Sequence, residues 1–158
     1  MSKNKLRLAF PKGFSLDLYS SPETLLEALS TNGVKVSEES CNIIKKLNCH
    51  RPRKYYNMCV IFPQELGFTR KAYYKDIVQR ARERGYWLCP DICGPYIAQA
   101  YTLRAWNYSL VVASKIIQTD TYGVIFEIVY NRGKIELEAG PCDLYTMWDL
   151  ETAFVFLR

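Results

Sequence analysis

The sequence predicts an α+β fold, in which an N-terminal helical hairpin and a central helix pack on one face of a mainly antiparallel C-terminal sheet. Capped segments with helical spacing of their apolar residues occupy residues 21–101, and segments rich in β-branched and aromatic residues occupy residues 108–158. Helices followed by a run of strands are typical of α+β proteins, whose helices gather on one side of an antiparallel sheet.

Two capped helices predict the N-terminal hairpin. Ser21 is a good N-cap, Pro22 fits the first helical position, and the helix stops near Asn32-Gly33. Ser37 caps the second helix, and Glu38-Glu39 in its first turn suits the helix dipole. The pair has the spacing of a helix–turn–helix and is similar over about two dozen residues to arginine-repressor-type DNA-binding heads. Because the two glutamates would repel phosphate, we interpret the pair as a structural hairpin.

The central helix has the clearest boundaries in the sequence. Thr69 can serve as its N-cap, and Phe68 and Tyr73 occupy the two positions of a hydrophobic staple. Gly85 can take the left-handed conformation that ends a helix. The pattern therefore predicts a helix between Thr69 and Gly85.

A stiff turn and a short second helix follow the central helix. Pro90 favours an extended Cys89, and Pro95 fits the first position of a helix with Gly94 as its cap. One face of that helix would be aromatic and apolar, so we expect it to close a core.

Strand signals dominate the end of the chain. Asn131-Arg132-Gly133 marks a tight hairpin, and the loop at 142–152 is long enough to cover an edge or rim a pocket. An earlier apolar run that ends at Pro63 predicts one more buried strand. The predicted strands span residues 58–62, 108–117, 124–130, 135–139 and 153–157.

Length and composition favour one domain over residues 1–158. The parts are a helical part at 1–48, a strand, basic loop and central helices at 49–107, and a meander at 108–158. A chain of 158 residues with 49% hydrophobic residues can bury one sizeable core. The chain lacks an apolar run of the roughly 20 residues that a membrane span needs, and its start lacks the features of a signal peptide. We therefore expect a cytoplasmic protein without a membrane partner.

The net charge of +5 is concentrated in the middle of the chain, where residues 49–90 hold nine Lys/Arg against three Asp/Glu. Such asymmetry can mark an acidic partner, or it can complement the acidic C-terminal third. Cations interleaved with tyrosines in residues 50–56 can also grip phosphates and stack bases. An alternative function is therefore nucleic-acid binding through Arg51, Arg53, Lys54, Tyr55, Tyr56, Lys71 and Lys75.

Six cysteines raise a third hypothesis, a thiol or zinc-dependent enzyme centred on Cys89 and Cys93. Two thiolates at this spacing can reach one tetrahedral ion, and Cys49 with His50 could complete the ligand set. The spacing is not that of a zinc finger, and His50 is the only histidine available as a base. We therefore interpret the cysteines as reduced thiols, several of them buried, and predict no catalytic residue, metal or other cofactor.

Motifs in the second half resemble those of a family of small bacterial proteins to which no activity is attached. They are Leu66-Gly67-Phe68-Thr69, Tyr74-Lys75-Asp76-Ile77, Arg80-Ala81, Gly85, Leu88-Cys89-Pro90, Gly94-Pro95, Tyr101 and the terminal Phe154-Val155-Phe156. The resemblance implies a shared fold over about the last hundred residues. Cys93 is not part of the pattern, so the resemblance implies no family-wide metal site.

The function that we favour from the sequence is a small binding or interaction module without catalytic activity. The chain is rich in aromatic residues with polar tips, which suit a ligand or protein partner, and its charge is segregated. The partner would be a protein or another acidic molecule. The candidate binding residues near the turn and in the last loop are Asp91, Tyr96, Gln99, Tyr101, Arg104, Trp106 and Trp148.

Overall fold

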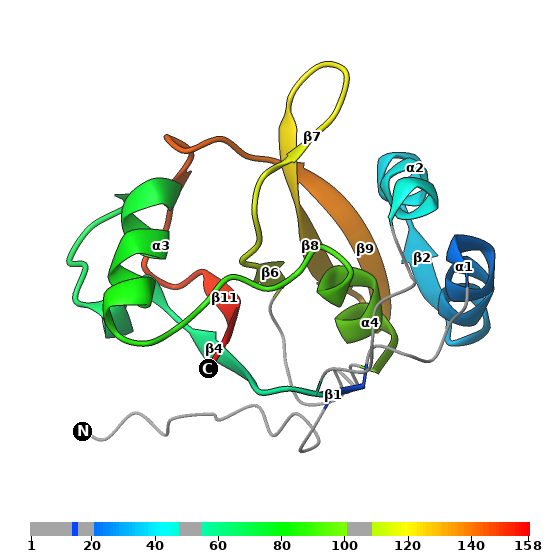
Figure 1. Ribbon diagram of the computed structural model, residues 1–158, viewed down its shortest axis with the longest axis horizontal. Helices are drawn as coiled ribbons and strands as arrows, with labels where there is room; N and C mark the ends of the chain where they lie inside the picture. The colour runs from blue at the N-terminus through cyan, green and yellow to red at the C-terminus, as the bar shows by residue number, and fades with distance from the viewer. Residues whose placement is uncertain (1–13, 16–20, 48–54, 101–108) are drawn as a thin grey trace.

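A computed structural model describes residues 14–15, 21–47, 55–100 and 109–158. Its main feature is a mainly antiparallel sheet of seven strands flanked by helices, which confirms the predicted α+β class (Figure 1). The sheet order is β2-β9-β8-β6-β11-β4, and β7 pairs with β8 outside this path. These strands are β2 (Val34–Val36), β4 (Met58–Ile61), β6 (Leu110–Val112), β7 (Ile117–Gln118), β8 (Gly123–Asn131), β9 (Lys134–Pro141) and β11 (Ala153–Leu157).

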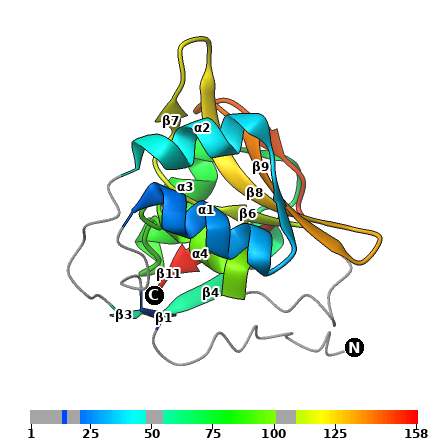
Figure 2. The ribbon, with the colours of Figure 1, turned by 90° about the vertical axis from the view of Figure 1, so that its right-hand side faces the viewer.

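Helices cover both faces of this sheet, whereas the sequence-based expectation places them on one. The first face carries α1 (Pro22–Thr31), α2 (Glu38–Lys46) and α4 (Cys93–Ala100). The opposite face carries α3 (Tyr74–Glu83) and the short helix η1 (Pro63–Leu66) (Figures 1 and 2).

Strand β11 explains why a second layer is needed. Ala153 and Val155 point into the cluster beneath α1, α2 and α4, whereas Phe154 and Phe156 point into the cluster beneath α3. Because successive strand side chains alternate between faces, a strand that is apolar at every position needs cover on both sides. The helix layer on the second face therefore follows from the sequence of β11.

The local signals of the N-terminal hairpin are confirmed. The Ser21 hydroxyl accepts a hydrogen bond from the Thr24 N–H at 3.3 Å, and the Ser37 hydroxyl accepts one from the Ser40 N–H at 3.1 Å. The connection between the helices does more than bridge them. It forms β2, which pairs in parallel with β9 from Val34 opposite Ile135 to Val36 opposite Leu137.

The predicted start of the central helix at Thr69 is wrong, because α3 begins at Tyr74 and the two preceding residues form β5 (Ala72–Tyr73). The N–H groups of Tyr74 and Lys75 donate to carbonyl oxygens of the distant loop at 143–146, which replaces a side-chain cap. The predicted end at Gly85 is confirmed, with φ of +81° and the Tyr86 N–H bonded to the Ala81 carbonyl.

Two further boundaries differ from the prediction. Helix α4 starts at Cys93 rather than Pro95, so Gly94 lies inside the helix, where it packs against Phe126. The strand predicted at 108–117 is divided into β6 and β7 by the segment 113–116, and residues 101–108 lie outside the described part of the chain. Strands β8, β9 and β11 match their predictions to within two residues.

Four short strands lie outside the main sheet. β1 (Phe14–Ser15) pairs with β3 (Tyr55–Tyr56), and β5 pairs with β10 (Met147–Trp148), both antiparallel. Two short apolar runs in residues 6–19 predict an edge strand or an extended arm, and only residues 14–15 of that segment are described. Within the described ranges, no helix has the length and apolar character needed to cross a membrane.

Candidate partner-binding surface

The ribbon formed by β5 and β10 has one buried face and one exposed face. Ala72 lies opposite Trp148, and Tyr73 lies opposite Met147. Ala72 is buried, and Trp148 packs edge-on against the ring of Phe154 with the centroids 5.4 Å apart. Because side chains alternate along a strand, Tyr73 and Met147 then point outward.

The loop that precedes β10 adds two more exposed apolar side chains. A carboxylate oxygen of Asp143 accepts a hydrogen bond from the Tyr145 N–H at 2.7 Å, and the Asp143 N–H donates to the Thr146 hydroxyl at 2.8 Å. This Asx turn leaves the carbonyl oxygens of Leu144 and Thr146 to accept from Lys75 N–H and Tyr74 N–H, at 3.0 and 2.9 Å. The turn thereby fixes the loop to the first turn of α3 and exposes Leu144 and Tyr145.

We call Tyr73, Lys75, Leu144, Tyr145 and Met147 the ribbon surface. The rings of Tyr73 and Tyr145 meet edge to face at 5.9 Å, and Lys75 Nζ lies 4.9 Å from the centroid of the Tyr145 ring. The exposed fractions of its four apolar members are 41% for Tyr73, 53% for Leu144, 63% for Tyr145 and 54% for Met147. Four of the six exposed large hydrophobic residues of the described chain therefore lie together here.

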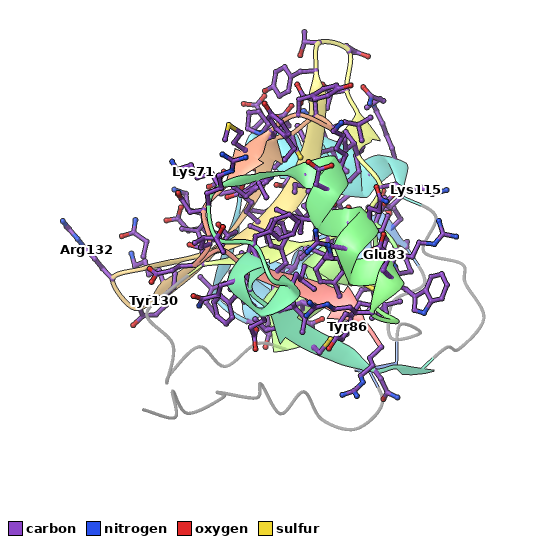
Figure 3. All side chains as sticks on the ribbon, turned by 90° about the vertical axis from the view of Figure 1, so that its left-hand side faces the viewer. Lys71, Glu83, Tyr86, Lys115, Tyr130 and Arg132 are labelled. Carbon is purple, nitrogen blue, oxygen red and sulfur yellow. The ribbon has the colours of Figure 1, made fainter. Side chains whose placement is uncertain are left out.

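The charges around the ribbon surface differ in how far they are engaged. Lys71 Nζ lies 3.0 Å from Asp149 Oδ1, so its charge is paired at the surface. Lys75 instead stands over an aromatic ring, where a cation is attracted by the π electrons and keeps its outer side open to solvent. Lys71 lies at one end of α3 and Tyr86 at the other (Figure 3).

Burial disfavours the ionised form of two titratable groups, Cys142 and Glu127. Burial raises the pKa of the Cys142 thiol to about 11. Burial also raises the pKa of Glu127, and the nearby carboxylate of Glu138 raises it further. The raised pKa of Cys142 opposes formation of a thiolate at neutral pH.

The described members of the ligand-binding set predicted from the sequence do not form one site. Tyr96 is buried in the cluster under α4, Gln99 is half-buried on the same helix, and Trp148 lies on the opposite face of the sheet. Asp91 lines a groove beside α2, whereas residues 149–152 line a separate hollow of about 590 Å³ with Gln64 and Lys71. Tyr101, Arg104 and Trp106 lie outside the described residues.

The predicted nucleic-acid residues fall into two groups. Arg51, Arg53 and Lys54 lie outside the described part of the chain, while Tyr55 and Tyr56 form the short strand β3. Lys75 belongs to the ribbon surface, and Lys71 stands beside it.

Cys89 and Cys93 lie in the core rather than at the surface. Both thiols are buried, and the Cys89 thiol contacts the Val155 carbonyl at 3.5 Å. A hydrogen bond with Cys93, together with burial, raises the pKa of Cys89 well above its usual range, which opposes formation of a reactive thiolate. Cys49 and His50 are outside the described residues, among which no group of three or more His, Cys, Asp or Glu side chains could hold a metal ion.

The sequence reasoning missed most of the ribbon surface. The sequence pattern places Tyr73 in a hydrophobic staple, and it places Leu144, Tyr145 and Met147 in a loop without a regular pattern. The signal in the sequence is five large apolar residues in the loop at 142–152, next to acidic residues, because such loops are usually polar.

Comparisons of this chain with protein-family models, with curated proteins and with solved structures give no match.

Proposed function

We propose that the protein is a small cytoplasmic binding module without catalytic activity of its own, and that a protein partner binds at the ribbon surface. The observation that carries this proposal is the gathering of Tyr73, Leu144, Tyr145 and Met147 on one exposed face. Contiguous apolar patches with polar rims mark interaction sites, and aromatic residues and methionine are enriched in interfaces. The buried face of the ribbon holds the patch rigidly, which lowers the entropy cost of binding.

The charge at the patch indicates the chemistry of the partner. Lys75 can pair with a carboxylate at the rim while its stem and the Tyr145 ring are covered by apolar groups. A partner that presents an apolar side chain beside an acidic one therefore fits the ribbon surface, in agreement with the basic character of residues 49–90.

The cysteines support two parts of this proposal, the absence of catalysis and the cytoplasmic location. Burial raises the pKa of Cys59 to about 11, as it does for Cys142, so these thiols are poor nucleophiles at neutral pH. Cysteines used as free, buried or half-buried thiols suit a reducing compartment.

Site-specific photo-crosslinking in the cells that make the protein tests the proposal. A photoreactive phenylalanine derivative is placed at Tyr145 and, as a matched control, at Trp87, which is 54% exposed and lies near the other end of α3. We expect a discrete protein adduct from position 145 and none of the same mass from position 87. With the purified partner, Met147→Glu should then weaken the complex at least tenfold, because it buries a charge at the centre of the patch. Equal adducts from both positions would contradict the proposal.

Binding of single-stranded nucleic acid is the second candidate, favoured by the position of Lys75 directly over the Tyr145 ring. Exposed aromatic rings beside cations stack bases and hold phosphates. A fluorescent single-stranded 20-mer should then bind with an affinity that falls steeply between 50 and 200 mM salt (about tenfold or more for several phosphate contacts) and falls further in Arg51→Glu, Arg53→Glu, Lys54→Glu protein. No retention of the 20-mer at low salt would exclude this candidate.

A further inference from the structure

A groove on the other side of the molecule separates α2 from the hairpin of β7 and β8, and its volume is about 880 Å³. Helix α2 crosses in front of the base of this hairpin (Figure 2). The floor of the groove is apolar, with Ile43 buried and Leu47 and Ile117 half-buried at the margin of the core. Its volume lies in the range of ligand-binding clefts, which combine an apolar floor with a few polar groups.

Strand β7 presents its edge to this groove. Three consecutive residues, Ile117, Gln118 and Thr119, line the groove. If β7 presented a face to the groove, only every second residue would line it, because strand side chains alternate between the two faces. Among the described residues β7 pairs only with β8, through Ile117 opposite Val124 and Gln118 opposite Gly123. The other edge of β7 is therefore available for pairing.

The ladder shows which backbone groups point into the groove. The Thr119 N–H donates to the Tyr122 carbonyl at 3.0 Å, so residues 119 and 122 form a hydrogen-bonded pair. Hydrogen-bonded and non-hydrogen-bonded pairs alternate in an antiparallel ladder, which makes Gln118 and Gly123 a non-hydrogen-bonded pair. The Gly123 carbonyl accordingly points away from β7 and accepts from the Cys142 N–H at 2.8 Å. By the same geometry the N–H and C=O of Gln118 point away from β8, toward the groove.

The wall opposite β7 carries separated charges. Glu38 begins α2 and Lys45 and Lys46 end it, about 10 Å further along the axis at 1.5 Å per residue. The Tyr122 hydroxyl donates to Glu39 Oε2 at 3.0 Å, which places the tip of the hairpin, including the exposed Asp120, at the acidic end of the helix. The wall formed by α2 is therefore acidic at one end and basic at the other, and Asp91 also lines the groove.

We propose that this groove binds an extended peptide segment of a partner protein, which pairs as an added strand with the outer edge of β7. An apolar side chain of the peptide packs on Ile43, Leu47 and Ile117. A basic side chain lies toward Glu38 and Asp120, and an acidic one lies toward Lys45 and Lys46. Main-chain hydrogen bonds supply the affinity of such strand addition, and the charges fix the direction of the peptide. This site is independent of the ribbon surface.

Selection of peptides on the intact protein tests the proposal. A random heptapeptide library displayed on phage is selected against the immobilised chain, and an enriched peptide is synthesised with a fluorescent label. We expect the enriched peptides to carry an apolar residue in the centre, with a basic residue on one side of it and an acidic residue on the other. Failure to enrich any sequence, or enrichment of sequences without the charge pattern, would overturn the proposal.

Two variants of Gln118 then locate the binding. Gln118→Pro removes the N–H that points to the groove and leaves pairing with β8 intact, since proline is tolerated on edge strands. We expect it to weaken the labelled peptide about tenfold, whereas Gln118→Ala, which keeps the N–H, should change affinity less than twofold. Lys45→Glu with Lys46→Glu should select peptides whose acidic residue is replaced by a basic one. Equal binding by the proline and alanine variants, with both folded by circular dichroism, would assign the peptide to another surface and refute the proposal.

Discussion

Glu127 has an unfavourable electrostatic environment for a carboxylate. Its carboxylate lies directly opposite Glu138 on the neighbouring strand and rests on Gly140, where a Cβ would overlap it. Burial, and then the charge of Glu138, raise the pKa of Glu127 above its ordinary value of 4.5. A raised pKa in the folded state means that the fold prefers the protonated carboxyl. The contribution of the protonated Glu127 carboxyl to the free energy of unfolding is fully present below pH 4.5, and it is lost as the pH rises through the raised pKa.

Replacing Glu127 by glutamine should therefore stabilise the protein at pH 7. Removal of one of two opposed like charges should raise the free energy of unfolding by about 0.5 kcal/mol, and the gain should shrink below pH 4.5, where wild-type Glu127 is protonated. Urea denaturation at pH 7 and pH 4 measures this. The control is Glu136→Gln on the same strand face, where Glu136 pairs with Lys35 at 3.8 Å, so its removal should stabilise nothing. The same response from both variants at both pH values would contradict the assignment.

Secondary-structure boundaries were predictable where the signal is local. Ser21, Ser37 and Gly85 act through hydrogen bonds or a backbone angle within a few residues, and the structure confirms all three. The start of α3 at Tyr74 could not be predicted from its own neighbourhood, because its first N–H groups bond to a loop about 70 residues later. The ribbon surface was missed for the same reason, since its two strands have two residues each and are defined by that distant pairing.

Gly94 allows helix α4 to pack closely against the sheet at Phe126. A Cβ at Gly94 would lie 2.6 Å from Phe126 Cδ2 and 2.7 Å from Phe126 Cβ, and the atoms nearest the backbone cannot move aside easily. We expect Gly94→Ala to lower the free energy of unfolding by about 2 kcal/mol despite the better helix propensity of alanine. The control is Ser30→Ala on the exposed side of α1, expected to change stability by less than about 0.5 kcal/mol. Chemical denaturation compares them, and a stabilised Gly94 variant would refute the close approach.

The whole molecule consists of two apolar clusters that share strands of one sheet. Leu110 on β6 points into the cluster of α1, α2 and α4, and Val111 beside it points into the cluster of α3. The sequence predicts the strands, but the expectation that all helices lie on one face is wrong for α3, which covers the opposite face. An apolar run shows that both faces of a strand are buried, but it does not show which helix covers which face. The shared strands make independent melting of one half unfavourable.

Unfolding should therefore be a single transition even when only one cluster is damaged. Leu110→Ala truncates the first cluster and Ile125→Ala the second, and both side chains are fully buried. Each variant should lose about 3 kcal/mol of unfolding free energy, with coincident urea transitions by tryptophan fluorescence and far-UV circular dichroism. Separate transitions by the two probes in either variant would show that the clusters unfold independently.

The Tyr74 and Lys75 N–H groups donate to loop carbonyls, so their hydrogen exchange reports on the state of the ribbon surface that covers them. Each amide exchanges its proton with solvent only when the loop of Leu144 and Thr146 lifts from α3, so the rate of deuterium uptake there measures how often the ribbon opens. A molecule that settles on Tyr145 and Met147 without touching either amide would still slow their exchange. Occupancy of this surface can thus be followed by mass spectrometry before the occupant has been identified.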